Sequence, residues 1–165
     1  MTERQIRLFG DPVLRSVSDP VRVGAPGNEQ LVDDLIETVQ IPGRAGLAAP
    51  QIGVGLRAFS WNVDGDIGYV LNPVLEVWGE PEIVDEGCLS VPGFYFPRRR
   101  YPHARVTGID LAGDEVVIEG DGVMAQALQH ETDHLDGKLY IEGLDPEVKR
   151  EAMREVRQAD WFRAA

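Results

Sequence analysis

Apolar residues recur at helical spacing near both ends of the chain. Asn28 can cap a predicted N-terminal helix that runs to about Val39, and Pro42 and Gly43 end it. Residues 146–162 carry a second apolar stripe and begin with a proline, which suits the first turn of a helix. The pattern therefore predicts one helix before and one helix after the middle of the chain.

The middle of the chain alternates apolar and polar residues with the period of β-strands. Two pairs of segments, joined around Asp64-Gly65 and Ala112-Gly113, predict β-hairpins. The predicted strands are residues 57–63, 67–71, 74–78, 81–85, 104–110 and 115–119. Helices outside a block of antiparallel strands indicate an α+β fold.

A third helix is predicted after these strands, and its inner face carries unusual residues. Asp121 can cap its start, and Gly137 suits the position just after its end. His130 and His134 continue one inward stripe, and Glu131 continues the neighbouring stripe. A glutamate is rarely buried without a partner, so this placement needs a functional reason.

These three residues form the pattern H-E-x-x-H. On a helix, two histidines four positions apart can bind one metal ion, and the glutamate can reach a water molecule on that ion. The expected architecture is therefore antiparallel sheets packed around a central metal-binding helix, with an N-terminal and a C-terminal helix outside them.

Composition limits the class of protein. The 165 residues are enough for one domain with a real core, and we expect a single domain over residues 1–165. The net charge of −12 argues against binding of a nucleic-acid backbone, and no apolar run approaches the length of a membrane span. Residues 1–5 show no signal-peptide segment, which predicts a cytoplasmic protein.

A catalytic metal ion needs a third protein ligand and an open position for water. His103 lies beside the basic run of residues 98–100, and we interpret both as parts of a solvated loop. Cys88, the only cysteine, follows a predicted strand from which it can reach a helix. A small buried side chain is the simplest interpretation of a lone cysteine, and a nucleophile or a metal ligand are the alternatives.

Three segments together make the chain resemble the peptide deformylase family. That family carries G-x-G-x-A-A-x-Q, E-G-C-L-S and Q-H-E-x-D-H in this order. Residues 86–90 and 129–134 match the last two motifs in full, and residues 44–51 match the first with Arg44 in place of its first glycine. The likeness extends over nearly the whole chain, which makes it far more specific than H-E-x-x-H alone.

The resemblance implies a metal centre. Cys88, His130 and His134 are the expected ligands of one divalent ion, with ferrous iron as the expected ion and zinc or nickel able to replace it. The ion lowers the pKa of a water molecule, so that hydroxide is available for attack. Glu131 is expected to act as the general base and then as the acid that returns a proton to the leaving amine.

The resemblance also implies the substrate, which is the formyl group of an N-formylmethionyl nascent peptide. The side-chain amide of Gln51 and the backbone N–H of Leu89 are expected to stabilise the oxyanion. The methionine side chain is expected in an apolar pocket. Its expected lining is Ala45, Gly46, Val84, Glu86, Val123, Gln126 and Ala127.

Three of these neighbouring positions carry further expectations. Gln126 is a polar exception in the pocket. Glu86 is expected to support the metal site from behind, with Arg100 paired to an acidic residue near it. Arg44 is strained if the backbone there needs a glycine conformation, and otherwise adds a cation to the rim of the cleft. A relative with lost or altered activity is therefore one alternative.

Two other hydrolases fit parts of the pattern. A zinc endopeptidase usually takes its third ligand downstream of H-E-x-x-H, yet no histidine or cysteine follows His134. A cysteine hydrolase would use Cys88 as its nucleophile and would survive removal of metal.

The C-terminal helix offers one surface for a partner. A weak, transient ribosome contact is conceivable through its cations, which are Lys149, Arg150, Arg154 and Arg157. The glutamates that alternate with them favour a solvated helix face instead.

Overall fold

The computed structural model describes residues 4–164. The first three residues, on which the expectation of no signal peptide partly rests, lie outside the described residues. The elements in chain order are α1 (Asn28–Val39), β1 (Gly46–Ala48), β2 (Ala58–Val63), β3 (Asp66–Trp78), β4 (Glu82–Cys88), β5 (Val91–Arg100), β6 (His103–Ile109), β7 (Glu115–Asp121), α2 (Gly122–Leu135), α3 (Pro146–Arg157) and α4 (Asp160–Arg163). Within residues 4–164, no helix is long and apolar enough to cross a bilayer.

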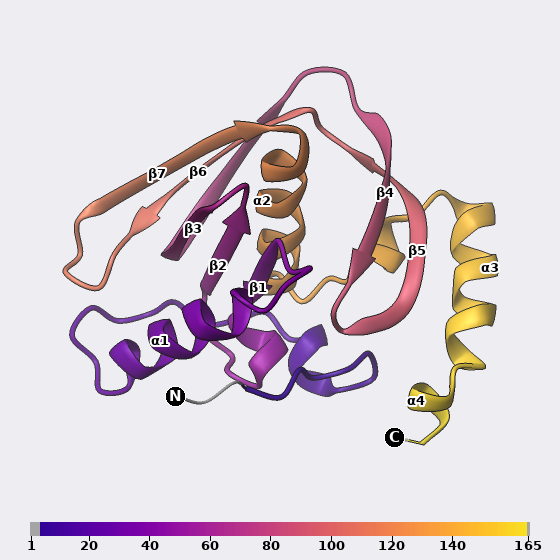
Figure 1. Ribbon diagram of the computed structural model, residues 1–165, viewed down its shortest axis with the longest axis horizontal. Coiled ribbons are helices and arrows are strands. Elements are labelled where there is room, and N and C mark those ends of the chain that lie inside the picture. Colours follow the sequence, from indigo (N-terminus) through magenta and orange to yellow (C-terminus); the bar gives the residue numbers. More distant parts are fainter. Residues whose placement is uncertain (1–3, 165) are drawn as a thin grey trace.

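The strands form two antiparallel sheets, and Figure 1 shows α2 between them. The larger sheet has the order β1-β2-β3-β6-β7, and the smaller one is the hairpin β4–β5. Asp64 and Gly65 turn the chain between β2 and β3 with positive φ angles of 51° and 83°, as a tight hairpin requires. The predicted α+β fold with a central helix is therefore confirmed.

Helix α2 is buried because two of its faces have partners. Its apolar residues Ala125, Leu128 and Leu135 pack against Phe59 and Val106 of the larger sheet. Its two histidines are turned toward the β4–β5 hairpin, and Glu131 lies against Gly46 of β1. This arrangement explains why one inward stripe of the sequence contains histidine and the neighbouring inward stripe contains leucine.

The C-terminal end of α2 is fixed from outside. The Arg57 guanidinium donates to the Leu135 carbonyl at 2.9 Å and forms an ion pair with Asp136 at 2.9 Å. Gly137 follows with a positive φ of 75°, as predicted for the residue after the helix. These contacts stabilise the turn of helix that carries His134.

Of the two predicted caps, Asp121 holds the predicted position without a capping hydrogen bond, and Asn28 does not hold it. Asp121 precedes α2, but its carboxylate makes no capping hydrogen bond and instead lies 2.6 Å from Nδ1 of His103. Gly27 is the residue before α1, while the Asn28 side chain donates to the Arg22 carbonyl. The partner of Asp121 is distant in the sequence, whereas the Arg22 carbonyl lies only six residues before Asn28.

Strand β5 is not among the predicted strands, and the arginine run at its end is interpreted from the sequence as a solvated loop. Pro92, Gly93 and Pro97 hide the alternation, yet the segment pairs with β4 over its length. The basic run ends in Arg100, whose side chain is only 5% exposed. The expected loop is therefore a strand that carries a buried cation, and His103 begins the next strand.

Two other boundaries differ from the expectation. The predicted strands 67–71 and 74–78 form one strand, β3, that continues through a bulge between Leu71 and Val74. The predicted C-terminal helix is broken after Arg157 into α3 and α4. The first difference arises because one bulge shifts the register without ending the pairing.

Asn72, inside the β3 bulge, generates a prediction about stability. It has a positive φ of 52°, and its side chain accepts from the Val21 N–H at 2.7 Å and donates to the Val21 carbonyl at 2.9 Å. Asn72→Ala loses both bonds and puts a residue that tolerates the left-handed region less well than asparagine at this φ, so we expect the free energy of unfolding to fall by about 2–4 kcal/mol. Asn72→Gly relieves the backbone and should lose about half as much. Urea unfolding measures both, and equal losses would contradict the role of φ.

Candidate metal centre

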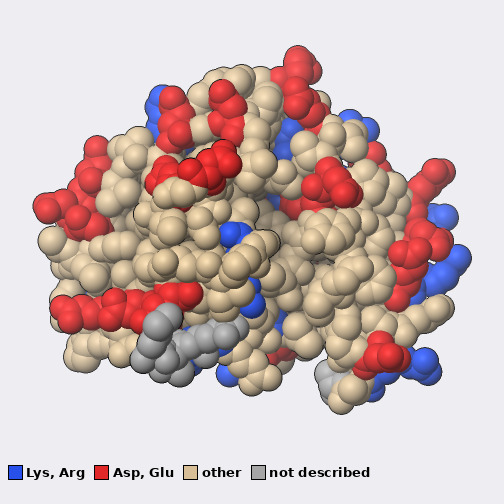
Figure 2. All heavy atoms as spheres, in the orientation of Figure 1, with Lys and Arg blue, Asp and Glu red and all other residues tan. Residues whose placement is uncertain are grey.

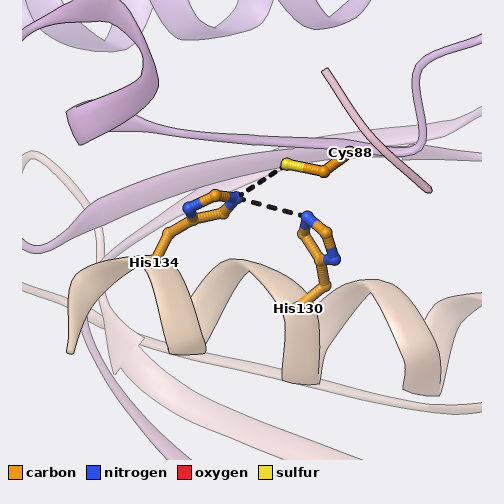
Figure 3. A group of neighbouring side chains, drawn as sticks. All are labelled: Cys88, His130 and His134. Atoms are coloured by element: carbon orange, nitrogen blue, oxygen red, sulfur yellow. Dashed lines mark hydrogen bonds between the residues drawn. The ribbon is translucent and has the colours of Figure 1, made fainter. Parts of the chain in front are cut away.

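Three side chains from two elements converge on one point, as Figure 3 shows. His130 and His134 lie one turn apart on α2, and Cys88 is the last residue of β4. The Cys88 Sγ lies 3.5 Å from Nε2 of His134, which lies 3.2 Å from Nε2 of His130. All three potential ligand atoms lie within 4.8 Å of one another. The structure thus brings together the three predicted ligands.

The spacing and the charge of this cluster fit a metal cation. Nitrogen and sulfur ligands of a tetrahedral ion lie roughly 3.4–3.6 Å apart when metal–ligand distances are typical. Burial disfavours a positive charge, yet the pKa of His130 is raised well above its ordinary value because Cys88 and Glu131 bring negative charge to the ring. Negative charge beside His130 fits a cation site, while burial and the neighbouring His130 hold the pKa of His134 well below its ordinary value.

A buried carboxylate orients the first histidine. The Nδ1 of His130 lies 2.8 Å from Oε2 of Glu86, whose side chain is 2% exposed. Burial works against the charged form of Glu86, but hydrogen bonds from Arg100 and His130 hold its pKa at about 2. This bond keeps Nδ1 protonated and leaves Nε2 of His130 to face the metal position.

Arg100 neutralises the carboxylate behind the histidine. Its guanidinium donates to both oxygens of Glu86, at 2.8 and 2.6 Å, and to Asp133 at 2.8 Å. The predicted pair between Arg100 and an acidic residue near the site is therefore confirmed. The Tyr140 ring, whose centroid lies 6.0 Å from that of His130, packs beside the same histidine.

Glu131, the candidate general base, is buried, and one of its two carboxylate oxygens lacks a hydrogen-bond partner among the described residues. The residue is 4% exposed, and the oxygen concerned is Oε1. Burial raises the pKa of Glu131 to about 7, against the attraction of His130. A Cβ on Gly46 would lie 2.6 Å from Oε2 of Glu131, so β1 approaches this carboxylate as closely as a glycine allows.

Gln51 is held at the other side of the cluster. Its Oε1 accepts from the Ala48 N–H at 3.0 Å, and its Nε2 lies 3.2 Å from Oγ of Ser90 and 3.8 Å from Sγ of Cys88. Leu89 is the residue between Cys88 and Ser90 in the turn of the β4–β5 hairpin. The two predicted oxyanion donors therefore lie beside Cys88: Gln51 approaches it in space, and Leu89 follows it in the sequence.

A cavity of about 410 Å³ opens onto this cluster. Cys88, His130, Glu131, Gln51 and Leu89 border it. The other bordering residues are Gly43, Arg44, Ala45, Gly46, Asp85, Gly87, Pro92, Gly93, Phe94, Tyr95, Val123, Gln126 and Ala127. Such a cavity has the size and the polar groups of a small-molecule or peptide site.

Two predicted pocket residues lie elsewhere. Val84 borders a neighbouring hollow, and Glu86 lies behind His130. Successive side chains of a strand point to opposite faces, so the cavity receives Asp85 and Gly87 of β4 instead. Ala45, Gly46, Val123, Gln126 and Ala127 do border the cavity as expected.

Arg44 is not strained in the manner that its place in the motif suggested. The non-glycine residues with positive φ among those described are Asp64 and Asn72. The Arg44 guanidinium donates to the Thr38 carbonyl at 2.9 Å, and the side chain borders the cavity. The second expectation, an arginine on ordinary backbone at the rim, is the one confirmed.

Sequence reasoning missed several residues that shape the site. Ser90 and Asp133 were inside recognised motifs, so their contacts with Gln51 and Arg100 had a signal in the sequence. Tyr95 and Tyr140 had none, because their positions depend on the missed strand β5 and on the turn after α2.

Comparisons with known proteins agree with these motifs. The model of the family described as polypeptide deformylase matches residues 3–150. A peptide deformylase of Acidothermus cellulolyticus is 49% identical over 161 residues, covering 98% of this chain and 89% of that protein. One from a Parafrankia strain is 50% identical over 164 residues with the same two coverages.

Solved structures give the same result. The peptide deformylase of Thermus thermophilus is 40% identical, with a TM-score of 0.86 and coverage of 98% of this chain and 97% of that one. A peptide deformylase from Legionella pneumophila is 33% identical, with a TM-score of 0.88 and coverage of 99% and 98%. The likeness therefore extends over sequence and fold alike.

Glu86 generates a prediction about metal affinity. Glu86→Gln removes the negative charge that orients His130, so we expect the dissociation constant for Zn²⁺ to rise about 10–100-fold. Competition with a chromogenic chelator measures it, with circular dichroism as the check that the variant is folded. Asp85→Asn is the matched control, because it changes the adjacent, exposed carboxylate and should bind as wild type does. Unchanged affinity in folded Glu86→Gln would show that the carboxylate does not support the ligand.

Proposed function

The chain belongs to the polypeptide deformylase family, and on that basis we propose how its own residues carry out the reaction. Members remove the N-formyl group from newly made polypeptides, and this chain is a metal-dependent hydrolase of that type. One observation carries the proposal for the residues. The Glu131 carboxylate borders the same cavity as the ligand candidates Cys88 and His130.

Cys88, His130 and His134 hold the divalent ion in this proposal. Two imidazoles and one thiolate suit ferrous iron, zinc or nickel better than magnesium or calcium, which prefer oxygen ligands. We propose ferrous iron as the working ion, with zinc or nickel able to replace it. When bound, such an ion lowers the pKa of water toward neutrality and polarises a carbonyl oxygen.

Glu131 moves the protons. Its unpartnered Oε1 takes a proton from the attacking water, and the same carboxyl group then gives a proton to the nitrogen that leaves as the peptide's amine. Gly46 fixes the position of the carboxylate, because the backbone of β1 lies against it. Burial keeps competing water away from this group.

Gln51 and Leu89 stabilise the negative charge that develops on the formyl oxygen. An amide nitrogen carries two N–H groups, so Gln51 can keep its bond to Ser90 and donate the other toward the ligand cluster. Leu89 contributes its backbone N–H from the adjoining turn. Donors fixed in this way need no reorganisation during the reaction, and each is typically worth about 100–1,000-fold in rate.

The first side chain of the substrate lies in the cavity. Ala45, Val123 and Ala127 provide small apolar surfaces beside the ligands, which suits the flexible thioether of methionine. Nascent peptides that begin with N-formylmethionine are the proposed partners, and the cytoplasm, where they are made, is the proposed location. We also propose that the chain acts as one domain, since the ligands on α2 and on β4 meet between its two sheets.

The alternatives fit less well. A zinc endopeptidase is disfavoured because the third ligand candidate, Cys88, lies upstream of the two histidines. The hypothesis that Arg44 strains the backbone and so abolishes activity is not supported, because Arg44 has no positive φ. A mechanism that uses Cys88 as a nucleophile can be distinguished by removing the metal, because such an enzyme would remain active.

The ribosome contact rests only on the cations of α3. Figure 2 shows basic and acidic side chains interspersed along the edge that α3 forms on the right. Arg154 pairs with Glu151 at 3.2 Å, which is the pairing of a solvated helix face. A weak and transient contact is therefore the most that we propose here.

Glu131 generates the central test of function. Wild type loaded with ferrous iron without oxygen should release amine from a formyl-Met tripeptide, and Glu131→Gln should lower kcat at least about 100-fold because it cannot accept the proton. A chelator should abolish wild-type turnover, and added metal should restore it. Turnover that survives complete removal of metal would contradict the metal mechanism and favour Cys88 as nucleophile.

Gly46 generates a test of positioning. Gly46→Ala forces the Glu131 carboxylate to shift, and a displacement of about 1 Å can cost on the order of 100-fold in rate. We expect kcat to fall about 10–100-fold with little change in KM or in thermal stability. Gly55→Ala is the matched control, because a Cβ there meets nothing within 4 Å and should leave kcat unchanged. Full activity of Gly46→Ala would show that the carboxylate tolerates the shift.

A further inference from the structure

A second hollow adjoins the cavity at the metal centre. It has a volume of about 330 Å³ and is bordered in part by Val84, Tyr101 and Pro102. The residues that border both spaces are Val123 and Gln126 of α2. These two side chains therefore form the partition between the space beside the ligands and the space beyond it.

Gln126 is the fixed part of that partition. It lies one helical turn before His130 and so faces the same side of α2. Its Nε2 donates to the Asp85 carbonyl at 3.2 Å and lies 3.4 Å from Oε1 of Glu86. The amide thus crosses from the helix to β4 and closes the gap between the two elements.

Val123 closes the gap less firmly. Its side chain is 56% exposed and has no polar group with which to reach β4. An apolar residue in place of Gln126 would likewise be free to change rotamer, whereas the hydrogen-bonded amide is held across the passage. The polar character of position 126 is therefore explained by its two acceptors on β4.

We propose that Gln126 sets the length of the first substrate side chain that the cavity accepts. The inference rests on the proposed function, in which that side chain lies in the cavity beside His130. A side chain that fits beside the ligands ends at the Gln126 amide. A longer unbranched side chain needs the second hollow, which Gln126 separates from the first.

The test compares two formyl dipeptides, one that begins with methionine and one that begins with the longer 2-aminooctanoic acid. The measured quantity is the ratio of their kcat/KM values on the iron-loaded enzyme. Wild type should favour formyl-Met, and Gln126→Ala should shift the ratio toward the longer side chain by about tenfold or more, the order of effect of added methylenes in an apolar pocket. Gln158→Ala is the matched control, because this exposed glutamine borders neither space, and it should leave the ratio unchanged.

Binding of the two deformylated peptides by calorimetry gives a second measurement that needs no turnover. Gln126→Ala should bind the longer peptide more tightly than wild type does, relative to the methionyl peptide. An unchanged ratio in both measurements, from a variant that melts as wild type does, would overturn the inference. Wild type that fails to process formyl-Met would instead overturn the proposed function, and the binding ratio would still decide the role of Gln126.

Discussion

The buried ion pair between Glu86 and Arg100 is the interaction on which the rest of the site depends. His130 needs a carboxylate behind it to present Nε2 to a metal ion, and that carboxylate is almost fully buried. A buried carboxylate without a counterion would be protonated or would unfold its surroundings. The guanidinium of Arg100 prevents both and also ties Asp133 of α2 to the same point. Charge balance behind the metal centre thus determines the geometry in front of it.

One hairpin supplies most of what faces the helix. The β4–β5 hairpin provides the proposed ligand Cys88, the carboxylate of Glu86 behind His130, its counterion Arg100 and the backbone N–H of Leu89 in the turn. Helix α2 contributes two histidines, one glutamate and the amide of Gln126, all on neighbouring faces. The chemistry therefore depends on the fit of this hairpin, of α2 and of residues 46–52, which bring Gly46 and Gln51 to the same site. This is the arrangement in which small displacements of backbone have large effects on rate.

The sequence predicted the elements that carry their own periodicity or a motif. The pattern around His130 and His134 located the helix and its inward face, and the motif around Cys88 identified the third ligand. What could not be predicted depends on pairing between distant segments. The strand β5 contains prolines, and its buried Arg100 resembles a surface cation until Glu86 lies opposite it. The partition at Gln126 was likewise invisible, because hydrogen bonds to β4 exist only once helix and hairpin are packed.

The two elements that share the metal centre are far apart along the chain, and this determines when the centre can form. Cys88 and His134 are separated by 46 positions, and β5, β6 and β7 lie between them. An unfolded chain with one cysteine and three histidines offers an ion no preformed set of ligands, so binding of the proposed ion is coupled to folding. The free energy of metal binding then adds to that of the packed helix and hairpin. A change that loosens the contact between hairpin and helix would accordingly weaken metal binding, even where all three candidate ligands are intact.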